Sequence, residues 1–248
     1  MVMNEPQPDT IQLDRKITRL VVLGDIHAEE ARLLEVLQRE SGETTAFVSV
    51  GDNVGYGDGE MSSRVCRILV DRNIPSVRGN HEGWMSGRRL YIVLGPSTNY
   101  LVDVDVLPWI AKLPLNLRFA TPHLPNSSIV IQHSFYDTKN KDWMFRDEIF
   151  QDRINDYLPE GEIYFIGHSH RPAFCKLGPT SLLETELYDA SSQNMKPYTI
   201  NPAGRYLVDT GSIGRAEWQK RKVLDTGTYA VLEFGDGRAQ VTLKTIRL

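Results

Sequence analysis

Histidine, aspartate and asparagine side chains follow five apolar stretches of this 248-residue sequence, four of which end at or near a glycine. Imidazoles, carboxylates and amide oxygens are ligands for divalent metal ions, and histidine is also the commonest acid–base group near neutral pH. The residues are Asp25 and His27 in LVVLGDIH, Asp52 in FVSVGDN, Asn80 and His81 in SVRGNH, His133 in IVIQH, and His168 and His170 in IYFIGHSH. This pattern predicts a metal centre, and only His123 among the six histidines lies outside it.

A structural explanation competes with metal binding for each of these residues alone. An aspartate or histidine at the end of a strand is more often a hydrogen-bonded structural residue than a ligand. The joint occurrence favours metal, because so many buried carboxylates and imidazoles would destabilise the fold unless a cation compensated them.

The ligand types also narrow the choice of metal. Mixed carboxylate, imidazole and amide ligands suit manganese, iron, zinc, nickel or cobalt better than calcium. The two cysteines, Cys66 and Cys175, lie in apolar surroundings and are predicted to be buried thiols, so a thiolate zinc site is not expected. Two ions about 3.5 to 4 Å apart that share a carboxylate would use all the candidate ligands, and they would suit in-line displacement at phosphorus.

Alternating strands and helices must position these side chains. Residues 17–24 and 45–51 are apolar runs rich in β-branched residues, and each precedes a segment with helical spacing of apolar residues, at 28–40 and 60–73. Residues 74–79 are predicted to form a third, shorter strand. Such β-α-β units form parallel sheets in which the carboxyl ends of the strands face one crevice, where residues distant in sequence can meet.

The second half of the chain is less regular. Residues 101–120 are predicted to form a short helix and a strand, and 127–133 and 162–168 are predicted strands. The amphipathic segment 144–158 between them is predicted to be a helix. Apolar and polar residues alternate around Gly-Asp-Gly in 227–248, which predicts a β-hairpin.

The predicted organisation is an N-terminal leader, residues 1–16, and a single domain, residues 17–248, with loop-rich segments at about 96–126 and 172–205. The net charge of -4 and the pI near 5.9 do not favour binding to long nucleic acids. The N-terminal residues lack the apolar core of a signal peptide, and no apolar stretch approaches the length of a membrane span. We therefore expect a cytoplasmic location and no membrane partner.

The ordered blocks resemble the calcineurin-like metallophosphoesterase superfamily, whose motifs are D-x-H, G-D, G-N-H-E/D, a lone histidine after a strand, and G-H-x-H. They occur here as GDIH, GDNVGYG, GNHE, IQHS and GHSH, between Gly24 and His170. The later VDTGSIGR resembles the N-P-G-S-V/I-G block of small bacterial members, with Asp209 and Thr210 in place of Asn-Pro. The resemblance implies an α/β fold, a four-layer α/β/β/α sandwich of two mixed sheets flanked by helices.

The resemblance also implies roles for individual residues. One metal ion would be held by Asp25, His27 and His170, the other by Asn80, His133 and His168, and Asp52 would bridge both. A hydroxide between the ions would attack phosphorus, and His81 would stabilise the transition state or protonate the leaving oxygen. The implied cofactors are two divalent or trivalent metal ions, manganese first, with iron, zinc, nickel and cobalt as alternatives.

Two departures from the family pattern bear on the substrate. The protein serine/threonine phosphatase branch has G-D-x-x-D-R-G, whereas here Gly55 replaces the aspartate that orients the catalytic histidine and Tyr56 replaces the arginine that grips phosphate. Protein phosphatase activity is therefore disfavoured. The G-D-x-V-G-Y-G form is similar to the compact bacterial phosphodiesterase-like branch, which predicts hydrolysis of a small phosphodiester, with nucleotides among the candidate substrates.

Two alternative functions stay open at this stage. The first is a phosphomonoesterase or nucleotide phosphatase that uses the same site. The second is a catalytically weak binding scaffold on the same fold, which the presence of every motif position disfavours because scaffolds are expected to lose ligands. No oligomeric state is predicted.

Overall fold

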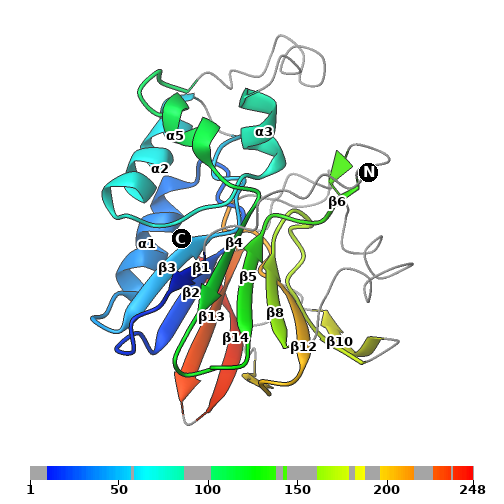
Figure 1. Ribbon diagram of the computed structural model, residues 1–248. Coiled ribbons are helices and arrows are strands. Elements are labelled where there is room, and N and C mark those ends of the chain that lie inside the picture. The colour runs from blue at the N-terminus through cyan, green and yellow to red at the C-terminus, as the bar shows by residue number, and fades with distance from the viewer. Residues whose placement is uncertain are drawn as a thin grey trace.

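The computed structural model describes residues 10–56, 59–86, 102–137, 142–143, 161–178, 182–187, 196–214, 226–235 and 237–247. Two mixed sheets pack face to face, and helices cover the outer face of one of them (Figure 1). This arrangement confirms the predicted α/β class with two mixed sheets.

The seven-stranded sheet contains the strands that precede His133 and the two histidines of GHSH. It has parallel pairs at its centre and antiparallel pairs toward one edge. Its order is β1 (Thr10–Gln12), β4 (Asn116–Ala120), β5 (Ser128–Gln132), β8 (Glu162–Ile166), β12 (Arg205–Asp209), β9 (Ala173–Leu177) and β10 (Leu182–Leu187).

The five-stranded sheet contains the strands that precede Asp25 and Asp52. Parallel pairing joins β2 to β3, and antiparallel pairing joins the other neighbours. Its order is β11 (Tyr198–Ile200), β14 (Arg238–Arg247), β13 (Thr226–Gly235), β2 (Arg19–Leu23) and β3 (Thr45–Ser49). A further two-stranded ribbon pairs β6 (Tyr136–Asp137) with β7 (Asp142–Trp143).

Burial on both faces explains why the strands are so apolar. Successive side chains of a strand point to opposite faces, so Leu20 and Val22 of β2 enter the core between the sheets while Val21 and Leu23 face the helices. Phe165 of β8 joins Leu20 and Val22 in the core between the sheets.

Four helices lie within the described residues: α1 (Glu30–Glu40), α2 (Gly59–Asp71), α3 (Asn80–Ser86) and α5 (Leu107–Lys112). In α1, the spacing of Leu33 and Leu37 places both side chains on the face that packs against the five-stranded sheet. Figure 1 shows α1 and α2 together on that face. No helix among the described segments is long and apolar enough to cross a membrane.

Two expectations about elements need correction. Residues 74–79 do not form a third strand but make a single parallel bridge, Ser49 to Ser76, because Pro75 has no N–H to donate to a ladder. Within the stretch expected to be a leader, Thr10–Gln12 pairs with β4 as an edge strand, and the neighbouring Leu13 is buried in the core between the sheets.

Other expectations are confirmed or fall outside the described residues. The short helix and the strand within 101–120 are present as α5 and β4, and the C-terminal hairpin is present as β13 and β14. Both cysteines are buried free thiols. The helix expected at 144–158 lies outside the described residues.

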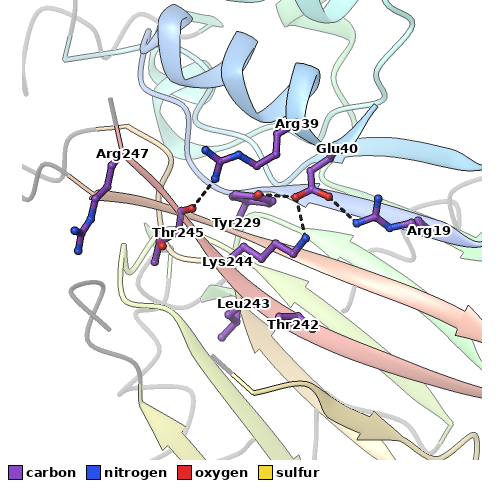
Figure 2. A pocket seen from close by; sticks show the side chains of 9 residues that line it. All are labelled: Arg19, Arg39, Glu40, Tyr229, Thr242, Leu243, Lys244, Thr245 and Arg247. Atoms are coloured by element: carbon purple, nitrogen blue, oxygen red, sulfur yellow. Dashed lines mark hydrogen bonds and ion pairs between the residues drawn. The ribbon is translucent and has the colours of Figure 1, made fainter. Parts of the chain in front are cut away.

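A buried carboxylate at the end of α1 ties the helix to the five-stranded sheet (Figure 2). Glu40 accepts hydrogen bonds from Arg19 of β2 at 2.6 Å, from the Tyr229 hydroxyl of β13 at 2.7 Å and from Lys244 of β14 at 2.9 Å. Burial raises the pKa of Glu40, but these three donors outweigh it and hold that pKa below its usual value.

Candidate metal centre

The eight predicted side chains meet where strands of both sheets end. Each comes from a loop or helix start that follows a strand or bridge, so the two sheets contribute from both sides. Asp25 follows β2, Asp52 follows β3, Asn80 and His81 begin α3, His133 follows β5, and His168 and His170 follow β8. The predicted convergence of residues distant in sequence is thus present.

One group of candidate ligand atoms comes from Asp25, His27, Asp52 and His170, which each offer one nitrogen or oxygen atom within 4.8 Å of the others. The His170 Nε2 atom is 2.9 Å from Asp25 Oδ2 and 2.9 Å from His27 Nε2. Such an approach of two imidazole nitrogens to one carboxylate is the geometry expected around a shared cation.

A second group is formed by Asp52, His133 and His168, again within 4.8 Å. The Asn80 Oδ1 atom joins it, 2.8 Å from His133 Nε2 and 2.9 Å from His168 Nδ1. Asp52 belongs to both groups, because its Oδ2 atom is 3.4 Å from His133 Nε2 and 3.9 Å from His27 Nε2.

Buried polar atoms in these groups fit a cation. Asp25 is fully buried, and its Oδ1 atom has no hydrogen-bond partner among the described residues. Burial lowers the pKa of His133, but the charges of Asp52 and Asp25 outweigh it and raise that pKa to about 9. The surroundings of His133 therefore favour a positive charge, which a metal ion can supply in place of a proton.

The imidazoles of His168 and His27 are held neutral, the form that binds metal. Burial, reinforced by the neighbouring His133, lowers the pKa of His168 to about 3. Burial, together with His170, lowers the pKa of His27 well below its usual value. For Asp52, burial raises the pKa, but the charges of His133 and His81 outweigh it, so the group is ionised.

Backbone strain is concentrated in the candidate ligands. Among the described residues, seven other than glycine have positive φ angles, and four of these are candidate ligands. They are His27 at 47°, Asp52 at 49°, His168 at 66° and His170 at 56°. Because L residues rarely adopt this conformation, the surrounding structure must enforce it, as is common at functional sites.

Glycines allow the loops to approach these side chains closely. A Cβ atom added at Gly79 would overlap Asp52 Oδ1, and one added at Gly167 would overlap Asp25 Oδ1. A Cβ at Gly55 would overlap His81 Nδ1. With His81 in this position, residue 55 can only be glycine, which explains the departure from the aspartate of G-D-x-x-D-R-G in structural terms.

Glu82 organises the site, a role that was not predicted from the sequence. It is fully buried, and its carboxylate accepts backbone N–H groups from Asp52 at 3.0 Å, Asn53 at 2.7 Å and Gly79 at 2.9 Å. Burial and the charge of Asp52 raise the pKa of Glu82 to about 7. The signal that could have found it is a carboxylate directly after the Asn-His pair in GNHE.

The VDTGSIGR block supports the first group from behind. The Ser212 hydroxyl and the Gly214 N–H both donate to the Asp25 carbonyl oxygen at 2.9 Å. Asp209 accepts a short hydrogen bond from Ser169, between the two histidines of GHSH. The block therefore holds the loops that carry Asp25 and His170.

The two-sheet fold and the Asp/His cluster define a metal-binding α/β protein. The family model described as calcineurin-like phosphoesterase matches residues 18–201. The chain therefore belongs to the calcineurin-like phosphoesterase family, and its enzyme class is that of the phosphoric ester hydrolases.

Other similarities extend over most of the chain. An uncharacterized protein of Methanocaldococcus jannaschii, MJ0912, is 23% identical over 233 residues, which cover 90% of this chain and 85% of the relative. A crystal structure described as "a putative diadenosine tetraphosphatase" has a TM-score of 0.51 and 17% identity, covering 96% of this chain and 98% of that chain. This likeness confirms the fold. A predicted phosphoesterase from Streptococcus pneumoniae has a TM-score of 0.44 and 17% identity, covering 91% of this chain and 88% of that chain.

Proposed function

We propose that the protein is a dinuclear metal-dependent phosphoesterase that hydrolyses small phosphodiesters. The single observation that carries this proposal is that Asp52 belongs to two adjacent groups of ligand atoms. One carboxylate with imidazoles on both sides suits a pair of ions better than a single ion. Manganese is the first candidate for both ions, with iron, zinc, nickel and cobalt as alternatives.

In this proposal, each ligand group holds one ion. Asp25, His27 and His170 would hold the first, Asn80, His133 and His168 the second, and Asp52 would contact both. When bound, the ions supply Lewis acidity to the phosphoryl oxygens and lower the pKa of a bound water.

His81 is the residue placed to assist the reaction. Its backbone N–H donates to Asp52 Oδ1 at 2.9 Å, and its Nε2 atom lies 3.9 Å from Asp52 Oδ2. The ring therefore lies beside the carboxylate that the two groups share, without belonging to either group. Burial lowers the pKa of His81. We propose that it stabilises negative charge on the phosphoryl group or protonates the leaving oxygen.

The preference for a diester follows from the loop Gly51 to Tyr56. Protein phosphatases of the superfamily have an arginine at the position of Tyr56, and the structure leaves no room for an aspartate at Gly55. We propose a small phosphodiester in the cytoplasm as the substrate. The alternative is a phosphomonoesterase with the same ligands. Comparing the hydrolysis of a diester with that of a monoester distinguishes the two.

The test is hydrolysis of bis(p-nitrophenyl) phosphate and p-nitrophenyl phosphate, with Mn²⁺ and with a chelator. We expect diester hydrolysis that depends on Mn²⁺, and Asp52→Asn or His133→Ala to reduce kcat/KM more than about 100-fold. His123→Ala is the matched control, because His123 contacts the Arg15 carbonyl oxygen far from the ligands and should keep full activity. Full activity of Asp52→Asn would contradict the proposal, and a preference for the monoester would favour the alternative.

A further inference from the structure

Tyr56 combines backbone strain with exposure at the edge of the candidate metal centre. Its φ angle is 57°, a conformation that is rare for a bulky aromatic residue. Its exposed fraction is 42%, whereas the neighbouring residues Val54 and Gly55 are buried. An exposed aromatic side chain held in a strained conformation indicates a role that packing alone does not explain.

The Tyr56 ring leans against the histidines of the site. Its centroid is 4.4 Å from that of His27 and 5.0 Å from that of His81, with tilted or edge-on geometry. The ring is partly exposed and lies beside His27 and His81, at the edge of the candidate metal centre. A substrate bound at the metal centre would meet this surface.

Trp84 of α3 adds a second aromatic group on the same histidine. Its ring centroid is 4.6 Å from that of His81, at an interplanar angle of 38°, and the residue is only partly buried. Tyr56 and Trp84 thus both border His81, the group proposed to act on the leaving oxygen. Aromatic side chains arranged around a phosphate-binding site are suited to stack on a flat ring carried by the ligand.

We propose that Tyr56 and Trp84 form an aromatic wall that binds a planar ring of the substrate, so that the preferred phosphoesters carry a nucleobase or a similar aryl group. This inference rests on the proposed function, because the ring can reach the wall only when the phosphoryl group lies at the metal centre. In this proposal, Tyr56 and Trp84, which are not candidate metal ligands, select nucleotide-like esters as substrates.

The experiment compares AMP with ribose 5-phosphate, which carries a hydroxyl group at C1′ in place of the adenine base. Dissociation constants are measured by calorimetry on Mn²⁺-loaded protein, or KM values are used if the monoesters are hydrolysed. We expect AMP to bind at least about fivefold more tightly, the lower end of what base stacking on an aromatic residue provides. Hydrolysis of the chromogenic diester is followed on the same preparation.

Variants separate stacking from packing. Tyr56→Leu and Trp84→Leu keep apolar bulk but remove the ring. We expect the AMP preference, the ratio of the ribose 5-phosphate constant to the AMP constant, to fall toward one in both variants. Tyr56→Phe keeps the ring and should retain the preference. Tyr56→Asn removes the ring at a position where asparagine tolerates a positive φ, so it should lose the preference while its melting temperature stays at or above that of the wild type.

Each outcome bears on one proposal. Equal affinities for AMP and ribose 5-phosphate in an enzyme that hydrolyses the chromogenic diester would overturn the aromatic wall alone. So would a Tyr56→Asn variant that melts earlier yet keeps the AMP preference, because the ring would then serve packing. Failure of both ligands to bind in a metal-dependent way, with no hydrolysis, would overturn the proposed function and this inference with it.

Discussion

The buried Glu82 carboxylate accepts hydrogen bonds from backbone N–H groups and a side-chain amide, and it thereby positions the candidate metal ligands. Glu82 holds the loop of Asp52 and Asn53 against the loop of Gly79, and it lies two residues from Asn80 in the chain. Its two oxygens share these three backbone donors, with the Asn53 side-chain amide as a fourth at 3.2 Å. A single carboxylate therefore fixes the relative position of two loops that carry candidate ligands.

Glu82→Gln is expected to weaken both the fold and the metal site. The new amide NH₂ would face backbone N–H donors, so the free energy of unfolding should fall by about 1 to 3 kcal/mol. Chemical denaturation in the presence of a chelator measures this loss, and a Mn²⁺ titration should show at least about tenfold weaker binding.

Glu60→Gln is the matched control for this prediction. Glu60 pairs with Arg64 on the surface, where its side chain is 74% exposed, and such pairs contribute little to stability. A Glu82→Gln protein as stable as the Glu60→Gln protein, with the same Mn²⁺ affinity, would show that the Glu82 hydrogen bonds do not position the site.

At the residue level, the ligand types and their order along the chain could be read from the sequence. The GNHE motif marks the position of Glu82 but not its contacts, because its donors include the backbone N–H groups of residues 52, 53 and 79 and no side-chain pattern marks a backbone contact. The surroundings of the His81 ring could not be predicted from the sequence either. They depend on how closely Gly55 approaches the ring, which only the three-dimensional structure reveals.

At the level of elements, the site depends on loops that touch side chains of other loops. The loop before α3 passes so close to the loop after β3 that a Cβ atom at Gly79 would lie 2.5 Å from the Asp52 backbone nitrogen. Helices and strands can be predicted from the sequence where the spacing of apolar residues stays regular along the whole element, as in α1 and β2. The predicted strand at 74–79 was wrong because a proline interrupts the hydrogen-bond ladder that its apolar residues suggested.

Gly79→Ala is expected to displace the bridging carboxylate. The added methyl must move either Asp52 or the start of α3, so Mn²⁺ affinity should fall at least about tenfold, with loss of diester hydrolysis. Gly83→Ala in the adjacent helix α3 is the control, because no described atom outside the helix's own backbone lies within 4 Å of its added Cβ, and alanine favours helix. Equal Mn²⁺ affinities of the two variants would count against the close contact.

At the level of the whole molecule, periodicity predicted strands and helices but not their assembly into two facing sheets. That arrangement was implied only by the family resemblance, since β2 and β8 are equally apolar and nothing in their patterns assigns them to different sheets. The network around Glu40 is also a property of the assembled molecule, because the Tyr229 and Lys244 donors lie 189 and 204 residues from Glu40 along the chain.

The Glu40 network predicts how stability changes with pH. Its folded-state pKa is depressed, so its contribution is fully present above the unfolded-state pKa and is lost as the pH falls through the folded-state pKa. Between pH 6 and pH 3, the free energy of unfolding should fall more steeply for the wild type than for Glu40→Gln. Denaturation curves at several pH values test this, and parallel pH profiles of the two proteins would refute it.

The positive φ angles of His27, Asp52, His168 and His170 have a consequence for how this protein can be improved. Glycine or asparagine would relax the backbone at these positions, so a screen that selects only for heat resistance should favour changes that remove the candidate ligands. Thermostability and catalysis therefore compete at the same few residues, and engineering of the scaffold has to leave these loops unchanged.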